Sequence, residues 1–241
     1  RHVLVDDVTV LSSRVTGLTF EQSVIKRACD IVVSLVALIV ASPIMLIEAL
    51  CIKLEDGGPV FFKQPRVTKD GQVFQVLKFR TMIVDADKHK KRLASQDDDR
   101  ITRVGKILRK LRIDELPQFI NILKGEMSVV GPRPEQEEIT EKYVEVLPEF
   151  RYRLKVKAGL TGLAQILGKY NTTPKDKLIL DLMYIEQYSF WVDLKLMLQT
   201  VKVLFKSDST EGVIGELPIN LEKHREELLG EDPSSDTSGE S

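Results

Sequence analysis

One apolar segment near the start of the chain restricts the possible folds more than any other feature. The segment DIVVSLVALIVASPIMLIEALCIK begins at Asp30, and no charged residue follows before Glu48. As a helix, these roughly seventeen uncharged residues would be about 25 Å long, against about 30 Å for the hydrocarbon core of a bilayer. The segment is therefore short for a membrane span. Ser42-Pro43 also interrupts it, because proline breaks or kinks a helix.

The flanking charges leave three structures open: a buried core helix, an ordinary membrane span, and a helix-break-helix that enters the membrane and returns. Lys26 and Arg27 precede the segment and Lys53 follows it, whereas a spanning helix usually has its excess of Lys and Arg on one side. In the third structure both flanks face the cytoplasm, and Ser42 could bond a carbonyl that the proline frees. The break favours re-entry of residues 24–52.

Composition excludes several kinds of site. The 241 residues carry a formal charge of -1, so no overall basic field attracts nucleic acid. Cys29 and Cys51 match no metal or redox spacing and indicate no disulfide framework, as in a reducing compartment. His2, His89 and His224 are far apart in sequence, which argues against a histidine metal site. A hard cation held by oxygen ligands remains possible.

The chain is expected to hold one main domain with appendages. Residues 1–23 would form an N-terminal extension, in which HVLVDDVTVLSSRV is typical of a strand with polar ends and not of a signal peptide. The start at Arg1 suggests the end of an upstream region of a longer protein. Residues 53–206 would form the main domain. The tail, residues 207–241, ends in the polar GEDPSSDTSGES, which predicts disorder.

A small β-hairpin is predicted from Asp70-Gly71, a turn signal between two β-rich runs at residues 60–67 and 73–82. Four cations would lie on it: Lys63, Arg66, Lys78 and Arg80. They could form a solvated basic face or a phosphate-binding edge, and the pattern fits both. Amphipathic helices surround the hairpin in sequence, so we expect an α+β fold.

Two adjacent carboxylates occur in RIDELPQF, residues 112–119, directly after a predicted helix. The apolar stripe of that helix comprises Ile101, Val104, Leu108 and Leu111. Asp114 could be the N-cap of the next helix, with Glu115 and Pro117 in its first turn. Cations of the first helix, and Arg133 in a rigid Pro-Arg-Pro loop, would then meet the two carboxylates.

This arrangement suits a substrate with several phosphate charges and a divalent metal. Mg²⁺ prefers one or two carboxylates together with phosphate oxygens. Metal and arginine charges reduce the repulsion between an anionic nucleophile and an anionic phosphorus centre. A carboxylate can attack phosphorus to form an acyl phosphate, and no histidine, cysteine or serine nucleophile setting accompanies the pair. With the apolar segment, this indicates phosphoryl-type transfer at a membrane surface.

Two later segments bear on ligands and on the membrane. Gly159, Gly162 and Gly168 predict a tight loop where a backbone can approach a ligand, without a dinucleotide or Walker pattern. A helix that starts at Ser189 is either an interfacial membrane helix or an ordinary packed amphipathic helix. Its apolar side comprises Trp191, Leu194, Leu198, Val201 and Phe205. Its polar positions include Lys195, Lys202 and Lys206.

Five segments in this order resemble the bacterial sugar transferase family, the monotopic polyprenyl-phosphate phosphoglycosyltransferases. They are KRACDIVVSLVALIVASP, GGPVFFKQPRV, KFRTM, DELPQFINILKGEMSVVGPRP and AGLTGLAQILG, and they cover residues 24–206. The resemblance implies transfer of a hexose-1-phosphate from a UDP-sugar to undecaprenyl phosphate with release of UMP, at the start of exopolysaccharide or capsule assembly. It further implies Mg²⁺, contact with membrane lipid, and a catalytic domain on the cytoplasmic face of the bacterial inner membrane. A homo-oligomer remains possible.

The resemblance assigns roles to individual residues. Asp114 matches the nucleophile, which would form a covalent aspartyl-phosphosugar intermediate, and Glu115 matches its partner in binding Mg²⁺. Arg109 matches a functional arginine of the preceding helix, and Arg133 matches an arginine assigned to phosphate binding. The remaining matches are Lys78 and Arg80, in a basic block assigned to substrate phosphate, and Ser42-Pro43 at the helix break.

The chain departs from the family pattern in one loop. AGLTGL at residues 158–163 stands where the family commonly has Pro-Gly-x-Thr-Gly-Trp, and Lys169 stands where Arg is common. These differences leave the Asp-Glu pair intact and bear on contacts to the acceptor or the sugar.

Overall fold

In the computed structural model, the described parts of the chain are the strands at 3–5 and 8–10, residues 17–84, residue 86, and residues 98–168 and 173–204. The tail expected to be disordered, Phe205, Lys206 and Lys169 therefore lie outside the described residues. The helices are α1 (Phe20–Asp56), α3 (Arg103–Leu111), α4 (Gln118–Lys124), α5 (Glu137–Val146), α6 (Leu163–Leu167), α7 (Pro174–Glu186) and α8 (Phe190–Leu204). The strands are β1 (Val3–Val5), β2 (Val8–Val10), β3 (Phe61–Val67), β4 (Val73–Phe79), β5 (Ser128–Val130) and β6 (Gly159–Thr161). The single strand predicted in the N-terminal extension is instead the antiparallel pair β1–β2.

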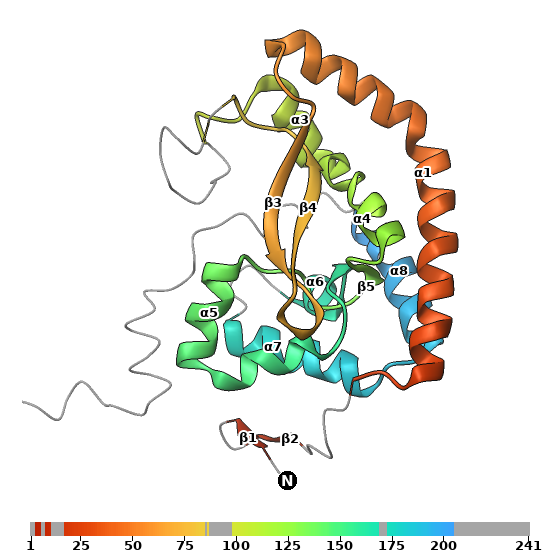
Figure 1. The fold of residues 1–241 in the computed structure, drawn as a ribbon, viewed down its shortest axis with the longest axis vertical. Helices are drawn as coiled ribbons and strands as arrows, with labels where there is room; N and C mark the ends of the chain where they lie inside the picture. The colour runs from red at the N-terminus through yellow and green to blue at the C-terminus, as the bar shows by residue number, and fades with distance from the viewer. Residues whose placement is uncertain are drawn as a thin grey trace, which may run out of the picture.

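The helix α1 runs along one side of the body and bends along its length (Figure 1). It extends beyond the predicted limits at both ends, from a capping box at Thr19 to a left-handed Gly57. Ser42 Oγ donates to the Ile39 carbonyl at 2.8 Å. Because Pro43 has no N–H for that carbonyl, the bond confirms the expected role of Ser42. The predicted break is thus a bend in a continuous helix.

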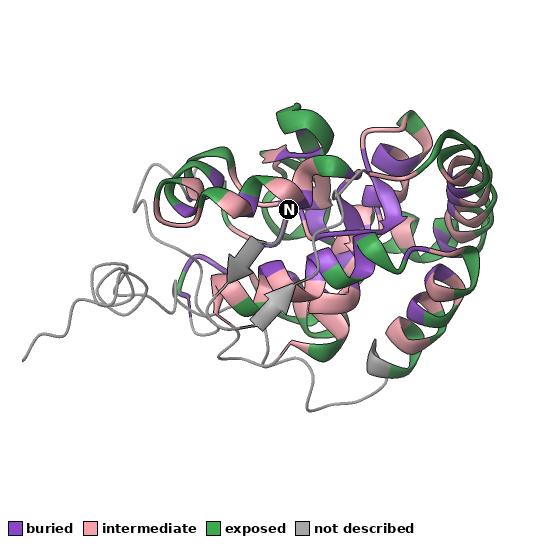
Figure 2. Cartoon of the chain, turned by 90° about the horizontal axis from the view of Figure 1, so that it is seen from below, coloured by how far each residue is buried: buried purple, intermediate pink, exposed green. Residues whose placement is uncertain are grey.

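The apolar side chains of α1 lie largely outside the protein core. Only 17% of its most apolar window is buried, and the residues over half exposed include Val32, Ile39, Val40, Leu46 and Leu50. Figure 2 shows buried residues gathered toward the centre of the chain and exposed residues on the outer helices. The core-helix alternative is therefore wrong. The length and apolar composition of α1 suit membrane association.

The first half of α1 is docked on the body by buried charges. Lys26 Nζ contacts Asp193 Oδ2 of α8 at 2.5 Å and donates to the Tyr184 hydroxyl oxygen at 3.1 Å. Arg27 donates to the Ile122 carbonyl at 2.5 Å and to the next carbonyl at 2.6 Å, at the carboxyl end of α4. Cations suit this end of a helix because its last carbonyls are unpaired and partly negative.

The far end of α1 is bound to the same body. Glu55 Oε1 accepts a bond from the Arg103 backbone N–H at 2.8 Å, at the start of α3. Asp56 pairs with Arg80, directly after β4. Both ends of the apolar helix are therefore fixed to one globular unit.

The predicted hairpin is confirmed. Strands β3 and β4 pair antiparallel from Phe61↔Phe79 to Val67↔Val73, and the turn holds Asp70 and Gly71 in the left-handed region. Phe74 and Val76 of β4 point into the main core. The fully buried centre of that core includes Ile122, Met127, Phe150 and Leu178.

Gly159 and Gly162, two of the three glycines predicted to form a tight loop, approach the protein's own backbone. Strand β6 pairs parallel with β5, as Ser128↔Gly159 and Val130↔Thr161. A Cβ added to Gly159 would lie 2.1 Å from the Gly131 nitrogen, and one added to Gly162 would lie 2.2 Å from the Gly131 oxygen. These two glycines therefore seat the loop that follows β5, which carries Arg133.

Candidate functional site

Asp114 and Glu115 lie in a short connection between two helices. Helix α3 ends at Arg112, which has a left-handed φ of 55°. A 3₁₀ turn, Ile113–Glu115, follows, and α4 begins only after Pro117. Asp114 makes no capping bond, so the interpretation of Asp114 as an N-cap is wrong. The physical reason is the reversal at Arg112, which inserts a separate turn ahead of α4.

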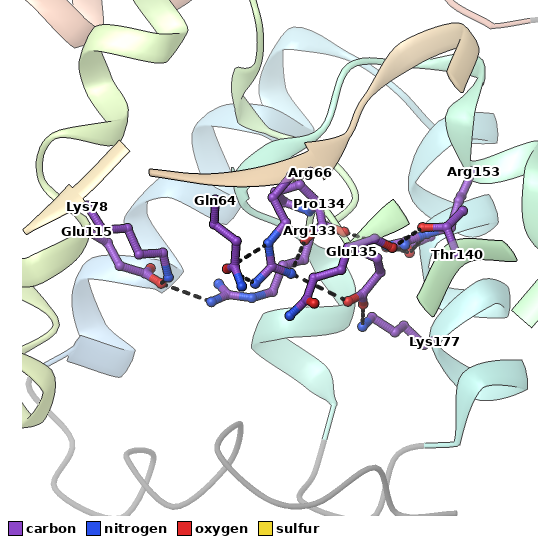
Figure 3. A network of polar contacts seen from close by, with 12 residues as sticks. Gln64, Arg66, Lys78, Glu115, Arg133, Pro134, Glu135, Thr140, Arg153 and Lys177 are labelled. Carbon is purple, nitrogen blue, oxygen red and sulfur yellow. Dashed lines mark hydrogen bonds and ion pairs between the residues drawn. The ribbon is translucent and has the colours of Figure 1, made fainter. Parts of the chain in front are cut away.

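Glu115 is held by two cations from distant parts of the chain. Lys78 Nζ of β4 donates to Glu115 Oε1 at 2.8 Å, and Arg133 Nη2 donates to the same oxygen at 2.9 Å. Figure 3 shows the three side chains converging. Burial opposes ionisation of Glu115, but the charges of Arg133 and Lys78 outweigh it and hold the pKa of Glu115 well below its usual range. Glu115 is therefore a fixed anion.

Asp114 has the opposite environment. The residue is 9% exposed, and its carboxyl group receives no hydrogen bond or ion pair from the described part of the chain. Burial and the neighbouring charge of Glu115 raise the pKa of Asp114 to about 6, against the opposing charges of Lys78 and Arg109. The turn that holds these two residues, the Asp114-Glu115 corner, thus has an unpaired and unusually basic carboxylate beside a strongly paired one. This difference favours nucleophilic chemistry at Asp114.

The loop that carries Arg133 is tied to the body through its backbone. The Arg133 carbonyl accepts from Arg153 Nη2 at 2.9 Å, and the Pro134 carbonyl accepts from Arg66 Nη1 at 3.1 Å. Arg153 is itself fixed by a buried pair with Asp181 at 2.7 Å. Two flanking prolines add stiffness, so Arg133 is presented with little conformational freedom.

The next residue, Glu135, extends this network (Figure 3). Lys177 of α7 pairs with Glu135, and Arg66 Nη1 lies 3.9 Å from it. Burial works against ionisation, yet the charges of Lys177 and Arg153 lower the pKa of Glu135 to about 2. No local pattern in the sequence singles out Arg153, Lys177 or Glu135, because charged residues in a mixed-charge helical stretch carry no local signal for a distant partner.

The two other predicted arginines, Arg109 and Arg80, have different partners. Arg109 Nε donates to Thr81 Oγ1 at 2.8 Å, and the Arg109 charge acts on Asp114. Its Nη1 is buried and has no partner among the described residues. Arg80 instead pairs with Asp56 at the end of α1, and its Nε and Nη1 have no partner in the described chain. The structure brings Lys78, Arg133 and Arg109 near the two carboxylates, whereas Arg80 is bound to the end of α1.

The residues present fit a hard divalent cation that shares its ligands with a substrate. Within the described ranges, no cluster of three or more His, Cys, Asp or Glu side chains could hold a metal by itself. Mg²⁺, however, accepts one or two carboxylates and completes its shell with phosphate oxygens and water. Such donors are available here. The carboxyl group of Asp114 is unpaired, and Lys78 and Arg133 both donate to Oε1 of Glu115, which leaves its Oε2 for a metal.

Comparison with known proteins agrees with this geometry. The family described as bacterial sugar transferase matches residues 21–207. The chain is 43% identical to a UDP-N-acetylgalactosamine-undecaprenyl-phosphate N-acetylgalactosaminephosphotransferase of Aeromonas hydrophila, over 75% of this chain and 43% of the relative. It is 42% identical to a UDP-glucose:undecaprenyl-phosphate glucose-1-phosphate transferase of Caulobacter vibrioides, over 76% of this chain and 71% of the relative. An Escherichia coli protein of the same name is 41% identical, over 77% of this chain and 41% of its own length.

The chain thus spans less than half the length of the Aeromonas and Escherichia relatives and most of the Caulobacter one. The family match includes the apolar helix, the hairpin, the Asp114-Glu115 corner and the Arg133 loop. On sequence and site together, the chain belongs to the bacterial sugar transferase family.

Proposed function

We propose that this protein transfers a hexose-1-phosphate from a UDP-sugar to undecaprenyl phosphate and releases UMP, at the start of exopolysaccharide or capsule assembly. The observation that carries the proposal is the unpaired carboxyl group of Asp114, a largely buried residue, beside the doubly paired Glu115. The names of the relatives, which specify UDP-sugars or undecaprenyl phosphate, support the substrates.

The reaction proceeds in two displacements at one phosphorus atom. In the first, an Asp114 carboxylate oxygen attacks the phosphorus that bears the sugar, and the bond from that phosphorus to the bridging oxygen breaks. UMP leaves with the bridging oxygen and its electron pair, and the sugar phosphate remains on Asp114 as an acyl phosphate. In the second, an oxygen of undecaprenyl phosphate attacks the same phosphorus and expels the Asp114 carboxylate. The product is the lipid diphosphate sugar.

The cations around the corner stabilise the charge that moves during both steps. Arg133 uses one nitrogen for Glu115, which leaves other N–H groups of its planar fork for phosphate oxygens. Lys78 and Arg109 add positive charge near Asp114. Asp114 and Glu115 would hold Mg²⁺, which supplies further neutralisation of phosphate charge when bound.

A re-entrant topology for α1 is part of the proposal. Both ends of the helix bind one globular unit, through Lys26–Asp193 and through Asp56–Arg80, which favours one membrane face for both ends. The apolar side chains between them are exposed. Helix α8 supports an interfacial position, because Trp191 is 73% exposed and Leu198 is 58% exposed. UDP-sugars are used in the cytoplasm, so we place the domain on the cytoplasmic face of the bacterial inner membrane.

The test is product analysis with purified protein in lipid nanodiscs, undecaprenyl phosphate and a panel of UDP-sugars. Release of UMP supports the proposal. Release of UDP would indicate a glycosyltransferase that moves the sugar alone, and absence of turnover with every sugar would indicate a non-catalytic scaffold. Without the lipid acceptor, a UDP-sugar labelled in the sugar should label the protein covalently. Asp114→Asn should abolish both labelling and turnover, and labelling that survives it would exclude Asp114 as the nucleophile.

Dependence on a divalent cation is a separate prediction. Excess EDTA should abolish UMP release, and added Mg²⁺ should restore it. Glu115→Gln should reduce activity roughly 100-fold or more while the protein still folds, because Gln is nearly isosteric but lacks the charge that binds the metal and the two cations. Thermal unfolding of the variant checks the fold. Full activity in EDTA would contradict the metal requirement.

A further inference from the structure

Glu48 is a buried residue of α1 whose carboxyl group stabilises no described part of the fold through a hydrogen bond. Its residue is 4% exposed, and both of its carboxyl oxygens are buried without a hydrogen-bond partner in the described chain. Removing a carboxyl group from water without replacing its hydrogen bonds costs free energy. An apolar side chain would serve packing better at this position. Ionisable residues within membrane segments usually have a functional reason.

The position of Glu48 points to the Asp114 corner. Met45 and Ile52 occupy the same face of α1 as Glu48, one turn to either side of it, and Ala49 is the next residue along the helix. They pack with Phe79, Leu108 and Ile113. Those three residues belong to the end of β4, to α3 beside Arg109, and to the position directly before Asp114. Glu48 lies close enough to Asp114 for the two carboxyl groups to interact electrostatically.

Two simpler roles do not fit. A metal ligand would require Glu48 to join Asp114 and Glu115, and no such group of three is found among the described residues. A structural anchor would show a partner, as Lys26 does with Asp193. Burial of an unpaired carboxyl group among apolar side chains favours its protonated form, because burial disfavours the charged form. In that form Glu48 is an O–H donor without an acceptor among the described residues.

We propose that Glu48 is a further substrate-binding residue, whose carboxyl group donates a hydrogen bond to the phosphate of the polyprenyl acceptor while that phosphate attacks the intermediate on Asp114. The inference rests on the proposed function. Glu48 is on α1, the helix proposed to enter the lipid, and it interacts electrostatically with the reacting carboxylate, so an acceptor that arrives from the lipid would pass beside it. A neutral donor suits this task because it binds an anion without pairing with Asp114.

The test separates the two half-reactions and uses the whole chain in nanodiscs. The first half-reaction is covalent labelling from the UDP-sugar without acceptor, and the second is transfer to added undecaprenyl phosphate. Glu48→Leu should leave labelling unchanged and raise the KM for undecaprenyl phosphate roughly tenfold or more, the size expected for a lost bond to a charged group. Glu48→Gln, which keeps an N–H donor of similar reach, should stay within about threefold of the native value.

Ser34→Ala is the matched control, because Ser34 Oγ is also buried and unpartnered on α1 but lies almost four turns from Glu48. It should change neither half-reaction. Glu48→Met replaces the leucine variant if thermal unfolding shows that leucine does not fold. Equal loss in both half-reactions, no loss in either, or a glutamine variant as impaired as the leucine one would each overturn the proposal. If the native protein itself gives no labelling and no UMP, the proposed function has failed instead.

Discussion

At the scale of single residues, the two carboxylates of the corner differ because their neighbours differ. Glu115 receives Lys78 and Arg133 on one oxygen, whereas Asp114 is buried without a partner in the described chain. A paired carboxylate is stabilised as an anion and is a poor nucleophile, while an unpaired one keeps its basicity. Asp114 is therefore suited to nucleophilic attack, and Glu115 is suited to binding cations.

The raised pKa of Asp114, about 6, predicts a pH profile for the first half-reaction. Only the ionised carboxylate attacks, and the proton is bound more tightly than in an ordinary aspartate. The rate of covalent labelling should therefore be level above pH 7 and fall about tenfold for each pH unit well below 6. Single-turnover labelling between pH 5 and 8 measures this. A rate that stays constant down to pH 5 would contradict the assignment.

Arg133 should not tolerate lysine. Lysine keeps the positive charge, but it loses the planar fork that can bind Glu115 and a phosphate oxygen at the same time. Arg133→Lys should lower kcat/KM for the UDP-sugar roughly tenfold or more, since charge-assisted bonds are worth about 1.5–3 kcal/mol. Arg151→Lys, at an exposed arginine, is the control. If the Arg133→Lys variant shows native kinetics, Arg133 does not bind the substrate phosphate and has a structural role.

At the scale of elements, local patterns predicted those features that depend on neighbours in sequence. The hairpin followed from Asp70-Gly71 between β-rich runs, and the bond from Ser42 to a freed carbonyl followed from Pro43. Both depend on turn and helix chemistry within a few residues. The meeting of Arg133 with the carboxylates was also predicted, from the rigid Pro-Arg-Pro loop that follows them in sequence, whereas Lys78 was assigned to the site only through the family resemblance.

The features that sequence analysis missed depend on tertiary neighbours. Arg80 could not be separated from Lys78 by pattern, yet its partner is Asp56 at the end of α1. The local sequence predicts Asp114 as an N-cap, because it does not show that Arg112 adopts a left-handed conformation and reverses the chain. Gly159 makes a close contact with Gly131, and only the pairing of β5 with β6 reveals this.

At the scale of the whole molecule, the two docked ends of α1 support the membrane topology that we propose for it. Lys26, which appeared to be a free positive flank, is buried against Asp193. Its charge is therefore a weaker topology signal than the sequence suggested. The geometry supplies a stronger one, since a helix that spans the bilayer would have to leave one of its two docking contacts on the opposite side of the lipid.

This geometry predicts that both ends of α1 lie in the cytoplasm. After replacement of Cys29 and Cys51, single cysteines would be introduced at two exposed positions, Glu21 in the first turn of the helix and Pro59 after its end. A membrane-impermeant maleimide should label neither in intact cells and both after permeabilisation, with a periplasmic cysteine reporter as the positive control. Labelling of one position alone in intact cells would show a spanning helix.

The bend is the feature that should keep the two ends together. Replacing Ser42 and Pro43 with leucine restores the N–H donor to the Ile39 carbonyl and removes the steric cause of the bend. The straightened apolar helix should favour a full span, so one of the two probe cysteines should become accessible in intact cells. UMP release should fall in parallel, because a spanning helix cannot hold Asp56 against Arg80 and Lys26 against Asp193 on one membrane face. Unchanged labelling with a straight helix would mean that the docking contacts, and not the bend, fix the topology.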